Sequence, residues 1–206
     1  MTPEQRLKNE VKLQVIDTQF NPTAIYNEFV ISHGSARIDI GMIEVDCFHG
    51  FELKTEQDSL AKLPHQIEHY NQFFDLIYAV VASRHLDKTL QMVPPFWGVY
   101  EAVYHQDDIS IKVIRQAQRN TLQDAVSVLN PIWKKELVEI LGAKIPVDYK
   151  VRKKTALELR QQIATLFPIN EIRSRAQQKI LMREPTWRKD CYINETLIKE
   201  KQHEWF

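Results

Sequence analysis

Three ionisable side chains, Asp39, Glu52 and Lys54, lie in segments that otherwise have the composition of buried β-strands. Successive side chains of a strand point to opposite faces, so Glu52 and Lys54 share a face. Asp39 joins them if residues 37–54 form a hairpin that turns at residues 44–46. Two carboxylates buried side by side need a compensating cation. A divalent metal beside a lysine is the arrangement that metal-assisted phosphodiester hydrolysis requires.

The elements that must position these residues follow in the order of a mixed sheet with helices against it. Before the hairpin we expect a helix over residues 3–16, a strand over 25–31 and a turn over 32–35; after it we expect a helix over 60–74, a strand over 77–82 and a second hairpin from 96–104 and 109–114. Leu63, Ile67 and Phe74 have the spacing of a buried helix face. Pro64 fits the first turn of that helix.

After about residue 120 the strand-like alternation ends and amphipathic helices follow. One opens at Pro131 and closes at Gly142, and two more are expected over residues 153–167 and 170–183. We therefore predict an α/β core over residues 1–120 and an all-α extension over 121–206. Nothing between the two parts is rich in Gly and Ser, so the extension should dock against the sheet.

Composition places the chain among soluble globular proteins. Its 206 residues carry a formal net charge of +0, with 44% hydrophobic and 26% charged residues. Cys47 and Cys191 are far apart and suggest free thiols in a reducing cytoplasm. The amino terminus lacks a signal pattern, and no apolar run has the length of a membrane span. We expect a cytoplasmic protein with no membrane partner.

Asp39 followed by Glu52-Leu53-Lys54 resembles the PD-(D/E)XK nuclease motif, and Gln66 matches the glutamine that many members place near the active site. Ile38 stands where the usual proline precedes the first acid. The wider sequence over about residues 25–86, with a weaker extension through residues 133–137, is similar to the bacterial sce7726 family, whose role is not established. The quoted stretches are Ser32 to Asp39, His49 to Lys54, Asp58 to Leu60, Leu63-Pro64, Gln66 to Glu68, Tyr70-Asn71 and Phe74-Asp75.

This resemblance implies a restriction-endonuclease-like fold and hydrolysis of DNA phosphodiester bonds by metal-activated water. Asp39, Glu52 and the carbonyl of Leu53 would bind Mg²⁺, with Mn²⁺ as an alternative. The metal would lower the pKa of a bound water and neutralise charge on the scissile phosphate. Lys54 would orient the attacking water or stabilise the developing charge. Gln66 would hold the water or a phosphate oxygen.

The residues leave an additional carboxylate open. Glu28 lies in the preceding strand, whereas many relatives place this acid on the first helix, where Glu10 is the counterpart; we prefer Glu28. His33 and Arg37 are candidate substrate contacts. The alternative for Arg37 is a structural salt bridge to Glu28 or Glu52, and the alternative for His33 is a simple turn.

The segment over residues 150–189 has a large excess of positive charge. Lys153, Lys154, Arg183 and Arg188 are candidates for tracking a phosphate backbone, and Trp187 for stacking on an unpaired base. Solvated helix faces balanced by the acidic first half explain the same charges equally well. The expected partner is nucleic acid, DNA before RNA, and a homodimer is compatible with the sequence.

Residues 65–69 also spell H-x-x-E-H, the inverted zinc-protease pattern. The helix must use one face for packing, and Gln66 is explained by the nuclease resemblance, so solvent-facing histidines are the favoured interpretation. The predicted function is a metal-dependent deoxyribonuclease in genome defence, repair or mobile-element maintenance. The alternative is a catalytically silent protein of the same fold that binds nucleic acid or protein. The intact set of Asp39, Glu52 and Lys54 favours the enzyme.

Overall fold

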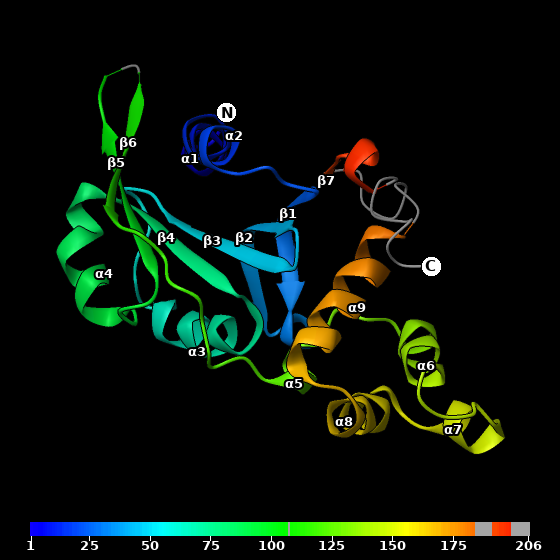
Figure 1. Cartoon of the computed structure of the whole chain (residues 1–206). Coiled ribbons are helices and arrows are strands. Elements are labelled where there is room, and N and C mark those ends of the chain that lie inside the picture. Colours follow the sequence, from blue (N-terminus) through cyan, green and yellow to red (C-terminus); the bar gives the residue numbers. More distant parts are fainter. Residues whose placement is uncertain (107, 184–190, 199–206) are drawn as a thin grey trace.

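A seven-stranded mixed sheet forms the centre of the protein, and helices cover both of its faces (Figure 1). The computed structural model describes residues 1–106, 108–183 and 191–198. The strands are β1 (Ala24–Ile31), β2 (Ala36–Glu44), β3 (Cys47–Lys54), β4 (Leu76–Ala82), β5 (Gly98–Tyr104), β6 (Ile109–Arg115) and β7 (Cys191–Ile193). Their order across the sheet is β6-β5-β4-β3-β2-β1-β7. The predicted class, a mixed α/β sheet with flanking helices and a helical C-terminal part, is confirmed.

The direction of the strands follows from the connections between them. β2 and β3 form the predicted antiparallel hairpin, in which Asp46 of the turn adopts a φ of 54°. β3 pairs in parallel with β4, and β4 in parallel with β5. Helices α3 (Leu63–Phe73) and α4 (Leu86–Met92) make these two crossovers. β4 is buried on both faces, which explains its continuous apolar sequence.

The two faces of the sheet have separate apolar cores. On one face lies α1 (Pro3–Val11), which continues through a π-helical turn (Lys12–Ile16) into α2 (Asp17–Gln19). Leu7, Val11 and Ile16 pack there against Phe51 and other strand residues. On the other face lies α3, so α1 and α3 sandwich the sheet (Figure 1).

The C-terminal helices belong to the core on the α3 side. They are α5 (Ala125–Val128), α6 (Lys134–Gly142), α7 (Tyr149–Lys153), α8 (Ala156–Leu166) and α9 (Ile169–Leu181). One buried cluster joins Phe73 of α3 and Val81 of β4 to Ile163 of α8 and Ile172 of α9. The extension therefore docks on the sheet, as expected from the absence of a flexible linker.

Polar contacts reinforce this docking. The carboxylate of Asp75 is fully buried, accepts the backbone N–H of Phe48 at 2.9 Å, and pairs with Arg119 and with Arg173 of α9. Asn120 donates to the carbonyls of residues 71 and 74. β7 adds an edge strand beside β1, so the region after residue 120 also completes the sheet.

Several boundaries differ from the expected ones for local reasons. The helix predicted over residues 153–167 is divided, because Thr155 begins a new helix with a capping box to Glu158. The last long helix starts at Ile169, directly after Pro168, rather than with Asn170 as its cap. The helix expected from residue 60 begins at Leu63, with Pro64 in its first turn as predicted. Sequence patterns missed α4 and β7.

Cys47 and Cys191 are free thiols, as expected. Within the described ranges, no helix combines the length and apolar composition that crossing a membrane would need.

Candidate active site

Three carboxylates lie in one row across β1, β2 and β3. The antiparallel register pairs Asn27 with Ile40 and Phe29 with Ile38, which brings Glu28 of β1 and Asp39 of β2, between these pairs, close together. In the hairpin, Ile40 pairs with Phe51. Beyond that pair, the carboxylate of Asp39 accepts the N–H of Leu53 and lies close enough to Glu52 to be affected by its charge. The hairpin thus brings together the two residues that the sequence suggested as metal ligands.

Glu28 interrupts the regular course of β1. Its φ of 51° lies in the left-handed region, which costs a non-glycine residue about 1–3 kcal/mol. Because the alternation shifts at this point, Tyr26 and Phe29 both join the core on the α3 side, with ring centroids 5.5 Å apart. Glu28 stays outside that apolar core. Backbone strain of this kind is concentrated at functional sites.

Asp39 is held by the neighbouring strand. Its Oδ2 accepts a hydrogen bond of 2.7 Å from the backbone N–H of Leu53. Burial first, and the charge of Glu52 second, raise the pKa of Asp39 to about 8, although the Leu53 N–H and the cation of Lys54 favour the charged form. At neutral pH a carboxyl group in these surroundings is mostly protonated, and further positive charge beside it would favour the ionised form. A metal ligand behaves in this way.

Glu52 is almost fully buried, with 2% of its surface exposed, and both of its oxygens are used. Oε1 accepts hydrogen bonds from Nζ of Lys54 and, at 2.6 Å, from Nε2 of Gln66. Oε2 lies 2.7 Å from the hydroxyl of Tyr70, which donates to it. The proposed catalytic lysine therefore touches the proposed metal ligand.

Gln66 and Tyr70 are one turn apart on α3 and reach the same carboxylate. Nε2 of Gln66 also lies 3.2 Å from the Tyr70 hydroxyl, which is 2.7 Å from the backbone carbonyl of Arg37. Within the described part of the chain, the buried Oε1 of Gln66 has no hydrogen-bond partner. Buried polar atoms are usually satisfied, so this oxygen is fit to accept from a water or a hydrated cation.

The site opens into a cavity of about 710 Å³, within the size range of small-ligand sites. Arg37, Lys54 and Lys62 bring positive charge to a lining that also carries five carboxylates. Ser35, Ser59 and His65 add further polar groups. The three cations give an anionic ligand points of contact inside the cavity.

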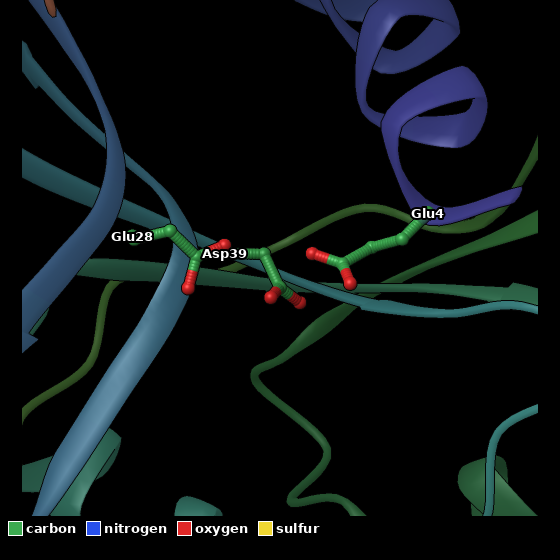
Figure 2. Close-up of side chains that lie close together, drawn as sticks. All are labelled: Glu4, Glu28 and Asp39. Atoms are coloured by element: carbon green, nitrogen blue, oxygen red, sulfur yellow. The ribbon is translucent and has the colours of Figure 1, made fainter. Parts of the chain in front are cut away.

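Of the two candidates for an additional carboxylate, Glu28, the preferred one, lies close to Asp39, and its role stays a prediction. Carboxylate oxygens of Glu4, Glu28 and Asp39, from α1, β1 and β2, lie within 4.8 Å of one another (Figure 2). Glu10, the alternative, instead accepts a hydrogen bond of 2.8 Å from Gln14. The first helix therefore does bring an acid to the site, but it is Glu4.

The other predicted contacts near the site are placed as follows. Arg37 lines the cavity, and its Nε lies 2.8 Å from Oε2 of Glu28, which is the salt bridge considered as its alternative role. His33 lies in a 3-10 turn (Ser32–Gly34). Leu53 donates its backbone N–H to Asp39. The sequence had suggested the carbonyl of Leu53 as a metal ligand, and this role stays a prediction.

The basic C-terminal candidates lie elsewhere. Lys153 packs on Tyr149 and Lys154 bonds Gln162, in and after α7, at the opposite end of the molecule from α1 (Figure 1). Arg183, which was predicted to contact substrate, has its guanidinium buried against Glu136, at 2.7 and 2.9 Å. Arg188 and Trp187 lie outside the described residues.

The histidines of the H-x-x-E-H pattern contact each other on α3. The Nε2 atoms of His65 and His69 are 3.1 Å apart. His65 is exposed and His69 half-buried, close to the solvent-facing arrangement that was expected. Among the described residues, the acids and histidines that gather in a potential metal-binding group of three are those of the Glu4 cluster, without this pair.

Sequence patterns missed three residues of the site: Glu4, Lys8 and Tyr70. Tyr70 follows Gln66 by four residues, and this spacing places both on one face of a helix. Glu4 and Lys8 have the same spacing but look like an ordinary surface ion pair. Only the position of α1 over the sheet shows that they reach Glu28.

Comparison with known proteins assigns the chain to a family over nearly its whole length. A family model described as bacteriophage P4 protein cII matches residues 1–203. The chain belongs to this family. Protein cII of Enterobacteria phage P4 is 24% identical over 140 residues, which are 66% of this chain and 53% of that protein. This cII-family chain therefore spans about half the length of the curated relative that it matches.

A solved structure of a protein of unknown function from Silicibacter pomeroyi is similar at a TM-score of 0.40 and 15% identity, over 90% of this chain and 97% of that one. Membership of the cII family assigns no activity to the cavity. The resemblance to PD-(D/E)XK nucleases and to the sce7726 family stays a prediction, and the chemistry of the site has to be argued from its side chains.

Proposed function

We propose that this protein is a metal-dependent nuclease of the PD-(D/E)XK type that hydrolyses DNA phosphodiester bonds. The observation that carries the proposal is the meeting of Asp39, Glu52 and Lys54 at one open cavity. They come from adjacent strands, and Gln66 reaches them from the helix that follows. Two acids, a lysine and an amide around one opening form a set suited to water-driven cleavage of a phosphodiester.

The donor set fits a hard divalent cation. Asp39 and Glu52 offer carboxylate oxygens, which Mg²⁺ and Mn²⁺ prefer. The raised pKa of Asp39 and the unpartnered Oε1 of Gln66 both indicate a place where a hydrated cation improves the electrostatics. When bound, Mg²⁺ would acidify water and neutralise charge on the scissile phosphate.

The remaining chemistry falls to the protein's own groups. Lys54 carries its ammonium into the cavity beside Glu52, where it can stabilise charge that develops on the phosphate oxygens. Oε1 of Gln66 can accept a hydrogen bond from the attacking water and so fix its position. Tyr70 orients Glu52 through its hydroxyl and keeps the carboxylate in place.

Nucleic acid is the proposed substrate, because the cavity lining offers cations for phosphate contacts. Arg37 and Lys62 flank the opening and can contact phosphates on either side of the cleaved bond. DNA before RNA, the possibility of a homodimer and a cytoplasmic location belong to the same proposal. Membership of a phage protein family favours maintenance of mobile elements or genome defence as the biological setting.

The test is cleavage of labelled DNA with Mg²⁺ or Mn²⁺, compared with EDTA. Supercoiled plasmid, duplex and single-stranded oligonucleotides, and a single-stranded RNA cover the substrate classes. Asp39→Ala, Glu52→Ala and Lys54→Ala should each lose at least 100-fold in rate, about the effect of removing one transition-state contact. Glu68→Gln, on the exposed face of the same helix α3, is the matched control and should keep wild-type activity.

Equal cleavage by wild type and the three alanine variants would refute the proposal. Salt-sensitive DNA binding without metal-dependent cleavage of any substrate would instead identify the protein as a catalytically silent binder of the same fold. Circular dichroism of each variant separates loss of activity from loss of fold.

A further inference from the structure

Lys8 places a buried ammonium among the acids of the site. Only 4% of the residue is exposed, although it lies on the amphipathic helix α1. Its Nζ is 2.5 Å from Oε1 of Glu28 and 3.3 Å from Oε1 of Glu4. These two carboxylates and Asp39 have oxygens within 4.8 Å of one another (Figure 2). The ammonium therefore forms ion pairs with carboxylates from two different elements, α1 and β1.

The surroundings keep this lysine charged. Burial alone lowers the pKa of an amine, but the hydrogen bond and charge of Glu28, with the charge of Asp39 and the hydrogen bond to Glu4, outweigh burial and raise the pKa of Lys8 above its ordinary value. An exposed pair four residues apart on a helix contributes little to stability. Lys8 is buried and pairs with Glu28 of strand β1, so its contacts should stabilise the fold more than an exposed pair does.

Asp39 is shared between two groups of acids. On one side it faces Glu52, the other proposed metal ligand. On the other side it belongs to the cluster with Glu4 and Glu28, where Lys8 supplies the positive charge. Two-metal phosphodiesterases place two ions about 3.5–4 Å apart across carboxylates arranged in this way. In this protein the group of Glu4, Glu28 and Asp39 already contains a cation, the ammonium of Lys8.

We infer that the ammonium of Lys8 is a resident cation that takes the place of a second metal ion, so that the protein binds one divalent ion, at Asp39 and Glu52. This inference rests on the proposed function. Lys8 is then a positioning residue: it holds Glu28 in its strained backbone conformation and keeps the Glu4 side of the row closed to metal. Arg37 holds the other oxygen of Glu28 at 2.8 Å.

Counting bound Mn²⁺ by electron paramagnetic resonance tests this directly. Wild type should bind one Mn²⁺ per chain, even at millimolar free Mn²⁺. Lys8→Met removes the ammonium at similar side-chain length and should bind two, with the spectral broadening expected of two ions about 4 Å apart. Lys8→Met combined with Glu28→Gln removes a carboxylate as well and should return the count to one.

Lys12→Met is the matched control, because Lys12 lies one turn further along and bonds the amide oxygen of Asn27 at 2.9 Å. It should bind one ion. Two ions in wild type would overturn the inference without any variant, and so would a single ion in a folded Lys8→Met protein. If folded wild type binds no Mn²⁺ at all, the proposed function fails and the inference falls with it.

Discussion

The hydroxyl of Tyr70 lies 2.7 Å from Oε2 of Glu52 and joins helix α3 to strand β3 at the centre of the site. Tyr70 is fully buried, and burial together with the charge of Glu52 raises its pKa, so the phenol stays protonated and donates. The carboxylate is thereby held from the helix side, while Lys54 contacts its other oxygen.

Tyr70→Phe should lower the free energy of unfolding by about 1–3 kcal/mol, because a buried charged acceptor loses its donor. Urea unfolding measures the change. Metal affinity should fall as well, since Glu52 is no longer oriented. Tyr104→Phe is the control: the Tyr104 hydroxyl has no hydrogen-bond partner among the described residues, so its removal should have little effect. Equal stability of both variants would contradict the role of Tyr70.

The raised pKa of Asp39 predicts pH-dependent metal binding. Because the pKa is about 8 in the fold and 3.8 when unperturbed, the metal-free protein binds this proton between these values. Binding of Mg²⁺ must release it, so affinity should rise about tenfold per pH unit up to pH 8 and then level off. Titration calorimetry in buffers of different ionisation enthalpy measures both affinity and proton release. A flat affinity from pH 6 to 8 would refute this.

The same group makes the metal-free protein less stable as pH rises. A raised folded-state pKa contributes stability that is fully present below the unperturbed value of 3.8 and is lost as pH rises through about 8. Asp39→Asn lacks the group that ionises, so its stability relative to wild type should increase between pH 5 and 9. Urea unfolding in EDTA across this range is the measurement, and parallel curves for the two proteins would count against the assignment.

The contact between Arg173 and Asp75 predicts that the helical extension and the sheet unfold together. Arg173→Met leaves the fully buried Asp75 with Arg119 alone and should cost about 3 kcal/mol, the low end for breaking a buried ion pair. Arg175→Met, two residues away, removes a half-exposed pair with Glu171 on the same helix and a cation–π contact with Phe167, and should cost about 1–1.5 kcal/mol. Thermal unfolding followed by circular dichroism compares them, and similar losses would contradict the prediction.

Arg183 should matter for stability and leave DNA affinity unchanged. Its removal strands the buried Glu136, so Arg183→Met should cost about 3–5 kcal/mol. Replacing both residues by methionine should recover much of that loss, since buried pairs are often replaceable by apolar groups. The folded double variant should bind DNA as wild type does in a filter-binding assay. A clear loss of affinity there would restore Arg183 as a substrate contact.

The centre of the site was predictable from sequence because it depends on short-range geometry. The period of a strand joins Glu52 to Lys54, a hairpin joins them to Asp39, and the following helix brings Gln66. Helix α1 adds Glu4 and Lys8 only through its tertiary position over the sheet. No local pattern encodes that position.

The basic C-terminal segment, residues 150–189, shows what could not be predicted from the sequence. Its cations looked available for phosphates because their partners are distant in sequence. Arg183 pairs with Glu136, Arg173 with Asp75, and Arg160 donates to the carbonyl of Leu129. The positive charge of this segment therefore partly reflects contacts that attach the helices to the rest of the protein. A capacity to bind nucleic acid could not be distinguished from this role before the fold was known.

Because β7 lies far from β1 in the sequence, the sheet that carries the site can be completed only after β7 has been synthesised. Ala24, Ile25 and Tyr26 of β1 pair with residues 191–193, which leave the ribosome long after β1 itself. Until then, the strand that carries Glu28 is an open edge with unpaired backbone groups. The acids of the proposed site therefore stay on an unfinished sheet until residues 191–193 have been synthesised.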